Sequence, residues 1–547
     1  MNLPSQFLQR MEAMLGDEFA AFEQSFHRER YSGLRANLLK TSVDNFQQVQ
    51  PFSLESIPWC ESGFYYDAVT EMERGLRPGK HPLHEAGLYY IQEPSAMAVA
   101  EAAGRAIRRH LKEAPEEPLR VLDLCAAPGG KSSQLAALLG GKGFLISNEI
   151  VPGRAKILSQ NMERMGLTNG IVVNHAPEEL SERFPGCFDV IVVDAPCSGE
   201  GMFRKDEDTI GQWSPDNVTM CGQRQKDILT EAFAMLAPGG TLVYSTCTFA
   251  PEENEAVVLW VLRNYPDVEV LATDPNVQEP LFDHGHPEWI AEDFGCEAVE
   301  LSEEEREAIR LGARLWPQKI KGEGHFMAVF RKAEEEFDEE EREKTWVGAA
   351  KPPKKGKKQK GAHKGFGNQI LKKAPAEWRE FAEEFFGEGT GTAGDNYAAA
   401  DRGPLDRISG EGWNFTLFGE QLYALHGDCP DLSGLTVMRA GLHLGTIKKG
   451  RFEPSHALAL AITPAMIDDL ALKDRCLEVN AGGNRTGAED QAVRYLKGEA
   501  LDVSGAEAER LPQDGWNLVT YGGYPLGWTK ISGGSAKNHY PKGLRWV

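Results

Sequence analysis

The 547-residue sequence contains no run approaching the ~20 apolar residues that a membrane-spanning helix needs. Its first residues also lack the basic and apolar regions of a secretory signal. Its nine cysteines include no C-x-x-C pair, so the sequence offers neither a disulfide framework nor the usual ligand spacing of a metal site. These absences predict a cytoplasmic protein with no membrane segment and no bound metal. The length of the chain predicts several domains.

Basic residues are in the minority, since 59 Lys and Arg face 82 Asp and Glu and give a net charge of -23. This balance excludes a protein that binds nucleic acid over its whole surface. The charge is uneven, because residues 334–343 carry eight acids whereas residues 351–373 carry nine lysines and no acid. The Lys, Pro and Gly content of 351–364 predicts a flexible linker, which either only tethers its neighbours or also holds RNA phosphates.

Apolar residues recur every three or four positions over residues 3–26, which predicts an amphipathic helix or helix pair opening an N-terminal domain. Aromatic and basic residues then interleave up to residue 98. They either stack bases and hold phosphates, or they form core and surface charge. These residues are Trp59, Phe64, Tyr65, Tyr66, Tyr89 and Tyr90, with Arg30, Arg35, Lys40, Arg74, Arg77 and Lys80.

Short apolar strands alternate with helical stretches over residues 99–332, which predicts an α/β fold: a parallel, Rossmann-like sheet with helices on both faces. The expected strands are 121–124, 144–147, 171–174, 190–194 and 242–245. A late strand at 326–330 is expected to finish the sheet as an antiparallel edge. We expect five segments: 1–98, 99–332, a charged linker at 333–374, 375–465 and 466–547.

A loop of small residues follows the first of these strands, and a helix follows the loop. Its glycines let the backbone approach a ligand, and the helix N-terminus offers free N–H groups. The loop fits neither the dinucleotide nor the nucleoside triphosphate signature, which favours S-adenosylmethionine as the cofactor. Glu149 ends the next strand, where it either accepts the ribose hydroxyls or is merely solvated. The loop residues are Cys125, Ala126, Ala127, Pro128, Gly129, Gly130 and Lys131.

Two cysteines follow later strands, Cys197 three residues after Asp194 and Cys247 two residues after Ser245. Because the carboxyl ends of parallel strands meet at one edge of a sheet, both thiols should face one crevice. Methylation of cytosine at C5 requires a thiolate that adds to C6, a group at N3 and a second group for release. Asp194, Cys197 and Cys247 supply these three groups.

Three motifs, in this order, resemble the Nop/Sun family of RNA 5-methylcytosine methyltransferases: Asp123-Leu-Cys-Ala-Ala-Pro-Gly-Gly-Lys131, Asp194-Ala-Pro-Cys-Ser-Gly-Glu-Gly201, and Ser245-Thr-Cys-Thr248 followed by Glu252, Glu253 and Asn254. The resemblance implies that Cys247 is the nucleophile, that Cys197 assists release and that Asp194 meets both base and cofactor. It implies that residues 125–131 and Glu149 bind S-adenosylmethionine. The chain departs at Ala176, where many members place an aspartate near the adenine.

The segments 92–95, 451–456 and 537–543 are similar to the bacterial RsmF-type subgroup. This similarity implies an RNA-binding domain at 1–98, a methyltransferase domain at 99–332 and a PUA-like RNA-binding domain at 466–547. It also implies a monomer that methylates cytosine in 16S ribosomal RNA or the small ribosomal subunit. The alternatives are transfer RNA as the substrate, or a non-catalytic ribosome assembly factor that binds RNA.

Three further residues lie near these motifs. Arg204 and Lys205 follow the Gly-Glu-Gly turn, where they either hold RNA phosphates or are ordinary surface charge. His325 either reaches the pocket or has a structural role.

Overall fold

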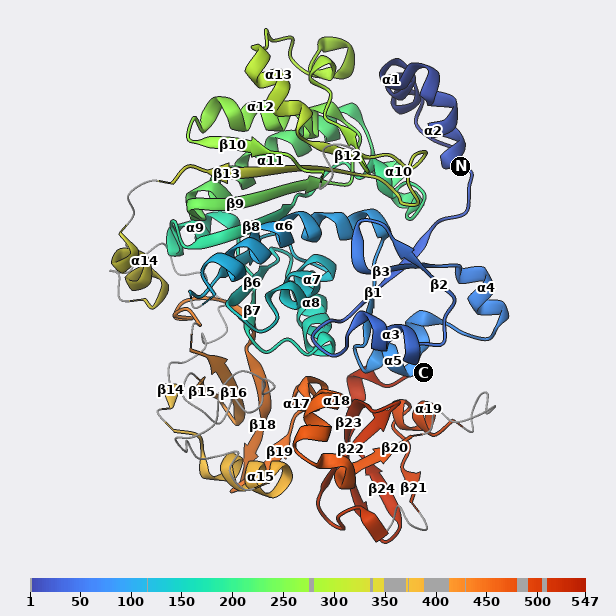
Figure 1. Cartoon of the computed structure of the whole chain (residues 1–547), viewed down its shortest axis with the longest axis vertical. Helices are drawn as coiled ribbons and strands as arrows, with labels where there is room; N and C mark the ends of the chain where they lie inside the picture. Colours follow the sequence, from blue (N-terminus) through green and yellow to red (C-terminus); the bar gives the residue numbers. More distant parts are fainter. Residues whose placement is uncertain are drawn as a thin grey trace.

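The computed structural model describes the chain except residues 1, 116, 275–279, 335–337, 349–369, 372, 388–412, 428, 480–489 and 504–508. The predicted linker at 351–364 therefore lies outside the described residues. Figure 1 shows the N-terminal segment beside a central sheet, with the C-terminal modules below both. Among the helices that the structure describes, none combines the length and apolar character needed to cross a bilayer.

The N-terminal segment begins with the expected helix pair, α1 (Ser5–Leu15) and α2 (Phe19–Ser25). Their apolar faces pack on aromatic residues of the central unit, since the ring centroid of Phe7 lies 5.2 Å from that of Phe203 and the Phe22 ring lies 5.3 Å from Phe249. Figure 1 places both helices beside α10 (Glu207–Gln212) and β12 (Ala313–Leu315). The helix pair therefore packs directly against the central unit.

An antiparallel sheet follows, in the order β2-β3-β1-β4. Its strands are β1 (Ser32–Ala36), β2 (Leu54–Ile57), β3 (Cys60–Tyr66) and β4 (Tyr89–Ile91), and its helices are α3 (Val43–Val49), α4 (Ala68–Glu73) and α5 (Pro82–Glu85). Phe64 and Tyr89 are buried in its core, which continues into the C-terminal module through Tyr524 and Leu526. These two aromatic residues of the N-terminal segment are therefore core residues.

The central sheet has the order β11-β12-β13-β9-β8-β5-β6-β7-β17, and β10 also pairs with β13. Strands β5 to β9 are parallel and include all five predicted strands, which confirms the predicted fold class. The chain order reverses between β5 and β8, where ligands bind in such sheets. The strands are β5 (Arg120–Asp123), β6 (Phe144–Asn148), β7 (Gly170–Val173), β8 (Phe188–Asp194), β9 (Leu236–Thr246), β10 (Val268–Leu271), β11 (Asp283–His284), β13 (His325–Lys332) and β17 (Val437–Ala440).

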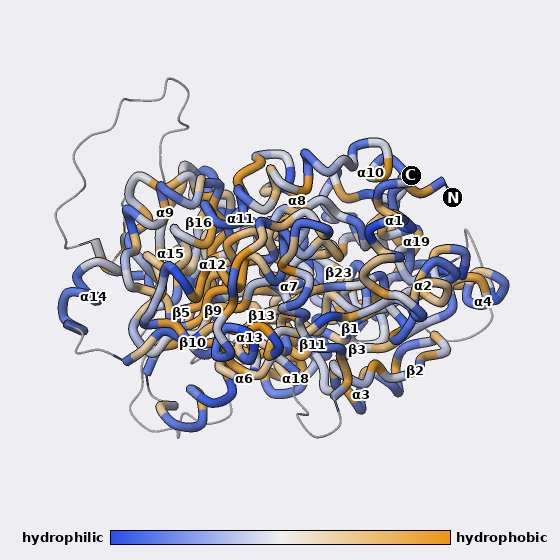
Figure 2. The backbone as a smooth tube through the Cα atoms, turned by 90° about the horizontal axis from the view of Figure 1, so that it is seen from above, coloured by the Kyte–Doolittle hydropathy of each residue, from blue (hydrophilic) through white to orange (hydrophobic). Residues whose placement is uncertain are grey.

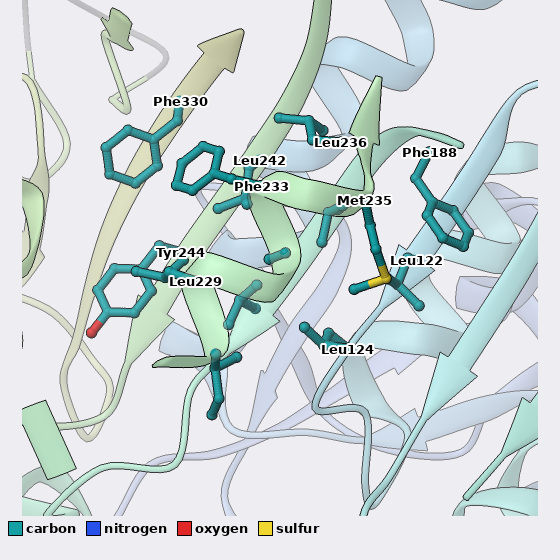
Figure 3. Packing of buried hydrophobic residues seen from close by; sticks show 14 of the residues in the cluster. Leu122, Leu124, Phe188, Leu229, Phe233, Met235, Leu236, Leu242, Tyr244 and Phe330 are labelled. Atoms are coloured by element: carbon teal, nitrogen blue, oxygen red, sulfur yellow. The ribbon is translucent and has the colours of Figure 1, made fainter. Parts of the chain in front are cut away.

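Helices cover both faces of this sheet. One face packs on α6 (Pro94–Glu113), α7 (Gly130–Leu139) and α8 (Pro152–Met165), and the other packs on α9 (Pro177–Arg183), α11 (Pro215–Met235) and α12 (Glu255–Asn264). Figure 3 shows the second core, where Leu122 and Leu124 meet Leu229 and Phe233. Strands buried on both faces read as continuous apolar runs, which is why their positions were predictable.

Strand β13 lies inside the sheet, so the prediction of an edge strand at 326–330 was wrong. It pairs antiparallel with β9 on one side and with β12 and β10 on the other. Strand β12 contains Arg314, whose buried side chain pairs with Glu255. A charged residue interrupts the apolar pattern by which a buried strand is recognised in a sequence, so this strand was not predicted. Figure 2 shows apolar segments gathered around β5, β9 and β13, while α14 (Glu339–Trp346) at the periphery is hydrophilic.

Helix α14 lies in the segment expected to be a charged linker. Its last residue, Trp346, is buried between Phe144, Phe184 and Phe188, with ring centroids 5.5 to 6.1 Å apart. Arg120 stacks over the Trp346 ring at 4.5 Å. The buried Trp346 ring and the hydrogen bond from Arg342 to the Cys187 carbonyl at 3.0 Å together attach this acidic helix to the central unit.

The chain beyond residue 369 forms two small sheets. The first is β14 (Ile370–Leu371), β15 (Trp413–Phe418), β16 (Gln421–His426), β18 (Leu442–Lys448) and β19 (Arg451–Pro454), with α15 (Ala376–Phe386), α17 (His456–Ala461) and α18 (Pro464–Asp469). The second is β20 (Cys476–Glu478), β22 (Trp516–Tyr521), β23 (Tyr524–Ser532), β24 (Ser535–Asn538) and β21 (Leu501–Asp502), with α19 (Gln491–Leu496). Between β16 and β18, strand β17 leaves this region to extend the central sheet beside β7.

Candidate active site

The predicted cofactor loop joins β5 to α7 at the reversal point of the sheet. Gly129 has φ +114°, and a Cβ atom there would come within 2.8 Å of the Met162 side chain, so the turn requires glycine. The Ser132 hydroxyl donates to the buried carboxylate of Asp123 at 2.6 Å, and burial raises the pKa of Asp123 to about 7. The loop is thus fixed at both ends, with the N–H groups of α7 directed toward the crevice.

Arg35, in β1 of the N-terminal segment, forms hydrogen bonds to this loop and to the start of α7. Its guanidinium is fully buried and donates to the Gly130 carbonyl at 3.2 Å, the Ser133 hydroxyl at 2.7 Å and the Gln92 side chain at 3.1 Å. The possibility that Arg35 holds RNA phosphates was therefore wrong. The residue is part of the junction between the N-terminal segment and the cofactor loop.

Glu149 ends β6 beside the loop, as predicted. Its carboxylate is 3% exposed; one oxygen accepts from the Val151 N–H at 2.8 Å and the other lies 3.5 Å from Arg154. Arg154 also donates to the Ala127 carbonyl at 2.9 Å. An acidic group at the end of the second strand, held facing the glycine loop, is the arrangement that accepts ribose hydroxyls. The donor set therefore fits a nucleoside cofactor.

Ala176 directly precedes α9. At this position, many members of the family that the motifs resemble place an aspartate near the adenine of the cofactor. The neighbouring loops are tied together by Asn148, whose amide donates to the Leu124 and His175 carbonyls at 3.1 Å. Asn174 donates to the Ile150 carbonyl at 2.9 Å. The methyl side chain of Ala176 accepts no hydrogen bond. The hydrogen bonds of Asn148 and Asn174 therefore hold the neighbouring loops in place where an aspartate is absent.

Asp194 and Lys131 form an ion pair between the loop and the end of β8. The Lys131 ammonium lies 2.8 Å from one Asp194 oxygen, and the Ser245 hydroxyl donates to the other at 2.8 Å. Burial by itself raises the pKa of Asp194, but the Lys131 ammonium outweighs it and holds this pKa below the ordinary value. Asp194 is therefore ionised at neutral pH and accepts hydrogen bonds.

The two cysteines meet at the ends of neighbouring strands. The Cys197 Sγ lies 3.3 Å from the Cys247 Sγ, and both side chains are half-buried. The Cys197 thiol hydrogen-bonds to Cys247 and is buried beside it, and both effects raise the pKa of Cys197 well above its ordinary value. Cys197 is thus a protonated thiol facing Cys247. Burial raises the pKa of Cys125 in the same crevice, so that thiol is unreactive.

The structure locates the three further residues that lie near the motifs in the sequence. Arg204 is buried and binds Glu323 at 2.7 Å and the Ser25 carbonyl at 2.7 Å, so its suggested role as a phosphate contact was wrong. Lys205 is exposed. His325 lies 2.9 Å from the Ser95 hydroxyl, and burial lowers its pKa. The next residue, Phe326, pairs with Thr246 of β9, so His325 lies near the end of the strand that precedes Cys247.

Asp283, His284 and His286 form a cluster whose ligand atoms lie within 4.8 Å of one another. One Asp283 oxygen already accepts from the Trp316 indole at 2.9 Å and from Lys319 at 3.2 Å. His286 bonds to Glu288 at 2.7 Å, and although burial lowers its pKa, these carboxylates raise it above the ordinary value. The potential ligand atoms of Asp283 and His286 thus already take part in hydrogen bonds and ion pairs with neighbouring side chains.

Family models match the chain in four places. They are the 16S rRNA methyltransferase RsmB/F model over residues 110–331, the N-terminal domain of 16S rRNA methyltransferase RsmF over 3–94, the RsmF first C-terminal domain over 405–462 and the methyltransferase RsmF PUA domain over 488–546. Together they span most of the chain in the order in which its units occur.

Two curated relatives carry the name ribosomal RNA small subunit methyltransferase F. The Escherichia coli protein is 39% identical over 306 residues, covering 54% of this chain and 61% of that protein. The Erwinia tasmaniensis protein is 40% identical over 272 residues, covering 48% of this chain and 54% of that protein. The alignments thus span less than two thirds of these relatives. A solved methyltransferase homologue from Pyrococcus horikoshii is 29% identical with a TM-score of 0.49, covering 60% of this chain and 95% of that one.

The matched models, the reversal of strand order at the glycine loop and the thiols beside it agree on one conclusion. The family predicted from the motifs is confirmed, and the chain belongs to the RsmF branch of the RsmB/F family.

Proposed function

We propose that this protein transfers a methyl group from S-adenosylmethionine to C5 of cytosine in 16S ribosomal RNA, through a covalent bond between Cys247 and C6. The observation that carries the proposal is the 3.3 Å separation of two thiols at the ends of β8 and β9, next to the glycine loop. A methyltransferase that acts on nitrogen or oxygen has no use for a thiol pair, whereas C5 of cytosine requires a nucleophile at C6.

The cofactor proposal depends on the donor set. The N–H groups at the start of α7 and the Glu149 carboxylate hold the nucleoside part, and Gly129 and Gly130 leave room for it. When bound, S-adenosylmethionine supplies an electrophilic methyl group.

The roles of the thiols follow from their environments. The Cys247 thiolate adds to C6 and leaves C5 electron-rich enough to take the methyl group. A base then accepts the C5 proton, the S–C6 bond breaks with its electron pair returning to the Cys247 sulfur, and the C5–C6 double bond is restored. Cys197 assists this release, and its sulfur lies 3.3 Å from the Cys247 sulfur, within hydrogen-bond distance. Both sulfurs must be present for turnover, but only Cys247 is needed for bond formation.

Asp194 contacts the base as a carboxylate. An ionised group accepts hydrogen bonds, so it takes one from the exocyclic amino group of cytosine, which cytosine alone among the pyrimidines offers. Lys131 remains a cation next to it and balances negative charge that develops on the ring during attack. This pair therefore favours cytosine over uracil.

The RNA substrate is proposed from the family and from the arrangement of the units. A cytosine must be unstacked before Cys247 can reach its C6 face. The N-terminal segment and the PUA-type module share one core and lie beside the central unit, so one RNA can contact both while its target enters the crevice. Lys205 is exposed after the Gly-Glu-Gly turn, which supports a role in binding an RNA phosphate.

The test is methylation of small-subunit RNA by the purified protein, with bisulfite sequencing of ribosomal and transfer RNA from cells lacking the gene. We expect a missing 5-methylcytosine in 16S RNA alone. Cys247→Ala should abolish methyl transfer, and Cys197→Ala should accumulate a covalent RNA adduct on a denaturing gel. An adduct with Cys247→Ala would exchange the two roles, and unchanged RNA methylation would favour the assembly-factor alternative.

A further inference from the structure

Two consecutive buried residues, Glu253 and Asn254, connect the loops that carry the two thiols. Glu253 is the last residue of η4 (Pro251–Glu253) and Asn254 directly precedes α12. Both are 0% exposed, and their side-chain hydrogen bonds go to groups that flank the two cysteines. Polar side chains are buried at a cost unless they make hydrogen bonds, so the bonds that they make reveal their role.

Asn254 holds both neighbours of Cys247. Its side-chain oxygen accepts from the Thr246 hydroxyl at 2.6 Å, and its side-chain nitrogen donates to the Thr248 carbonyl at 3.0 Å. Asparagine just before a helix usually caps that helix. Here both of its polar atoms are directed to the chain on either side of the nucleophile, which fixes the backbone that carries the Cys247 sulfur.

Glu253 does the same for Cys197. One of its oxygens accepts from the Ser198 N–H at 2.9 Å and from the Gln225 amide at 2.8 Å, and the other bonds to the Ser198 hydroxyl. The Gln225 amide also donates to the Pro196 carbonyl at 3.1 Å. The residues before and after Cys197 are therefore both held by this buried pair.

The two supports are joined to each other. The Ser198 hydroxyl lies 2.8 Å from the Thr248 hydroxyl, and the Gly201 N–H donates to the Cys247 carbonyl at 2.9 Å. Tyr244 reinforces the joint, because its hydroxyl lies 2.6 Å from the Glu253 carbonyl. A shift of either loop would thus break bonds on both.

We propose that Glu253 and Asn254 are positioning residues that set the separation of the two thiols, with Asn254 placing Cys247 for attack and Glu253 placing Cys197 for release. The inference rests on the proposed function and deepens it, since it divides the two halves of the reaction between adjacent side chains. Reaction rates are sensitive to small displacements of this kind: a misplacement of about 1 Å costs roughly 100-fold.

The protonation of Glu253 makes a conservative test available. Burial raises the pKa of Glu253 to about 8, so the group is largely neutral at pH 7. The Ser198 hydroxyl donates to one Glu253 oxygen and also lies 2.8 Å from the Thr248 hydroxyl, to which it can donate instead. Glutamine has the same shape, one acceptor for the Ser198 N–H and Gln225, and an N–H donor for the Ser198 hydroxyl. Glu253→Gln should therefore keep the support that Glu253→Ala removes.

The experiment measures single-turnover kinetics of the full chain with 16S RNA and radioactive S-adenosylmethionine, following adduct and product separately. Asn254→Ala should slow adduct formation by about 100-fold without accumulation of adduct. Glu253→Ala should form the adduct and release it slowly, resembling Cys197→Ala, while Glu253→Gln restores release. Glu252→Gln is the matched control on the same turn, because Glu252 faces Arg10 at 3.8 Å.

Two outcomes would overturn the inference: equal slowing of both steps in both alanine variants, or variants whose melting temperature falls while formation and release stay normal. Cofactor affinity, measured by calorimetry, should match the wild type in every variant, since these residues lie outside the glycine loop. Failure of the proposed function is recognised separately, because then the wild-type protein forms no adduct or product.

Discussion

Replacement of Lys131 by methionine should move the acid limb of the pH–activity profile to higher pH. The ammonium lies 2.8 Å from the Asp194 carboxylate, and two unit charges at that distance attract by about 6 kcal/mol at an effective dielectric constant of about 20. The Asp194 side chain is 31% exposed, and solvent reduces the attraction to roughly 2 to 3 kcal/mol. This corresponds to a shift of about two pH units.

The sign follows from the competing effects on Asp194. Burial favours the neutral acid and the ammonium favours the carboxylate, so removal of the ammonium leaves burial unopposed and raises the pKa of Asp194. If the carboxylate is the form that binds cytosine, kcat/KM at saturating cofactor should then fall at a higher pH than in the wild type. Lys131→Arg is the control, because it keeps the charge and should keep the limb near its original position.

The assay is methylation of 16S RNA between pH 5 and pH 9, with the limb compared among wild type, Lys131→Met and Lys131→Arg. Asp194→Asn in the Lys131→Met background removes the titrating group and should abolish the shifted limb. The reasoning is refuted if the limb of Lys131→Met stays in place or moves to lower pH, or if the double variant retains it.

Three further outcomes are expected. Glu149→Ala should weaken S-adenosylmethionine binding by roughly 10- to 100-fold in calorimetry, because the hydrogen bonds that its side-chain oxygens accept from the ribose are lost. An unchanged affinity would show that Glu149 does not contact the cofactor. Folding raises the pKa of Glu253 from 4.5 to about 8, so its contribution to the free energy of unfolding is fully present below pH 4.5 and is lost as the pH rises through 8. The melting temperature of the wild type, relative to that of Glu253→Gln, should therefore fall between pH 4.5 and pH 8. A rise over this range would contradict the raised pKa. Arg314→Leu should lower the free energy of unfolding by about 3 to 5 kcal/mol in denaturant titrations, because Glu255 stays buried without its partner, and Arg314→Leu with Glu255→Leu should recover much of the loss.

The sequence predicted the central strands and the glycine loop well, because these features are local. Strands such as β7 and β8 contain short apolar runs, and the cofactor loop contains glycines that few other residues can replace. Strand β12 was missed because Arg314 is paired inside the sheet with a residue 59 positions away. A buried ion pair has no local signature, so the strand looked like a loop.

The sequence predicted that the two thiols and Asp194 lie at one edge of the sheet, but it did not predict the residues that hold them there. Cys197, Asp194 and Cys247 follow strands that could be located, so their meeting followed from the rule for parallel sheets. Arg35 and Arg204 look like surface charge in the sequence, and only the folded chain shows that they are buried among carbonyls and carboxylates. Glu253 and Asn254 were noticed as part of a motif, but their hydrogen bonds are visible only in three dimensions.

Strand β17 has a consequence for how the chain is made. Residues 437–440 pair with β7 and cover an edge that the central unit would otherwise present to other molecules. During synthesis, the catalytic sheet therefore exists with that edge open until more than a hundred further residues have left the ribosome. A shortened protein that ends after β13 would keep every reactive side chain, yet it would expose β7 as a template for aggregation. The C-terminal part of the chain thus protects the catalytic part during folding, in addition to any role in binding RNA.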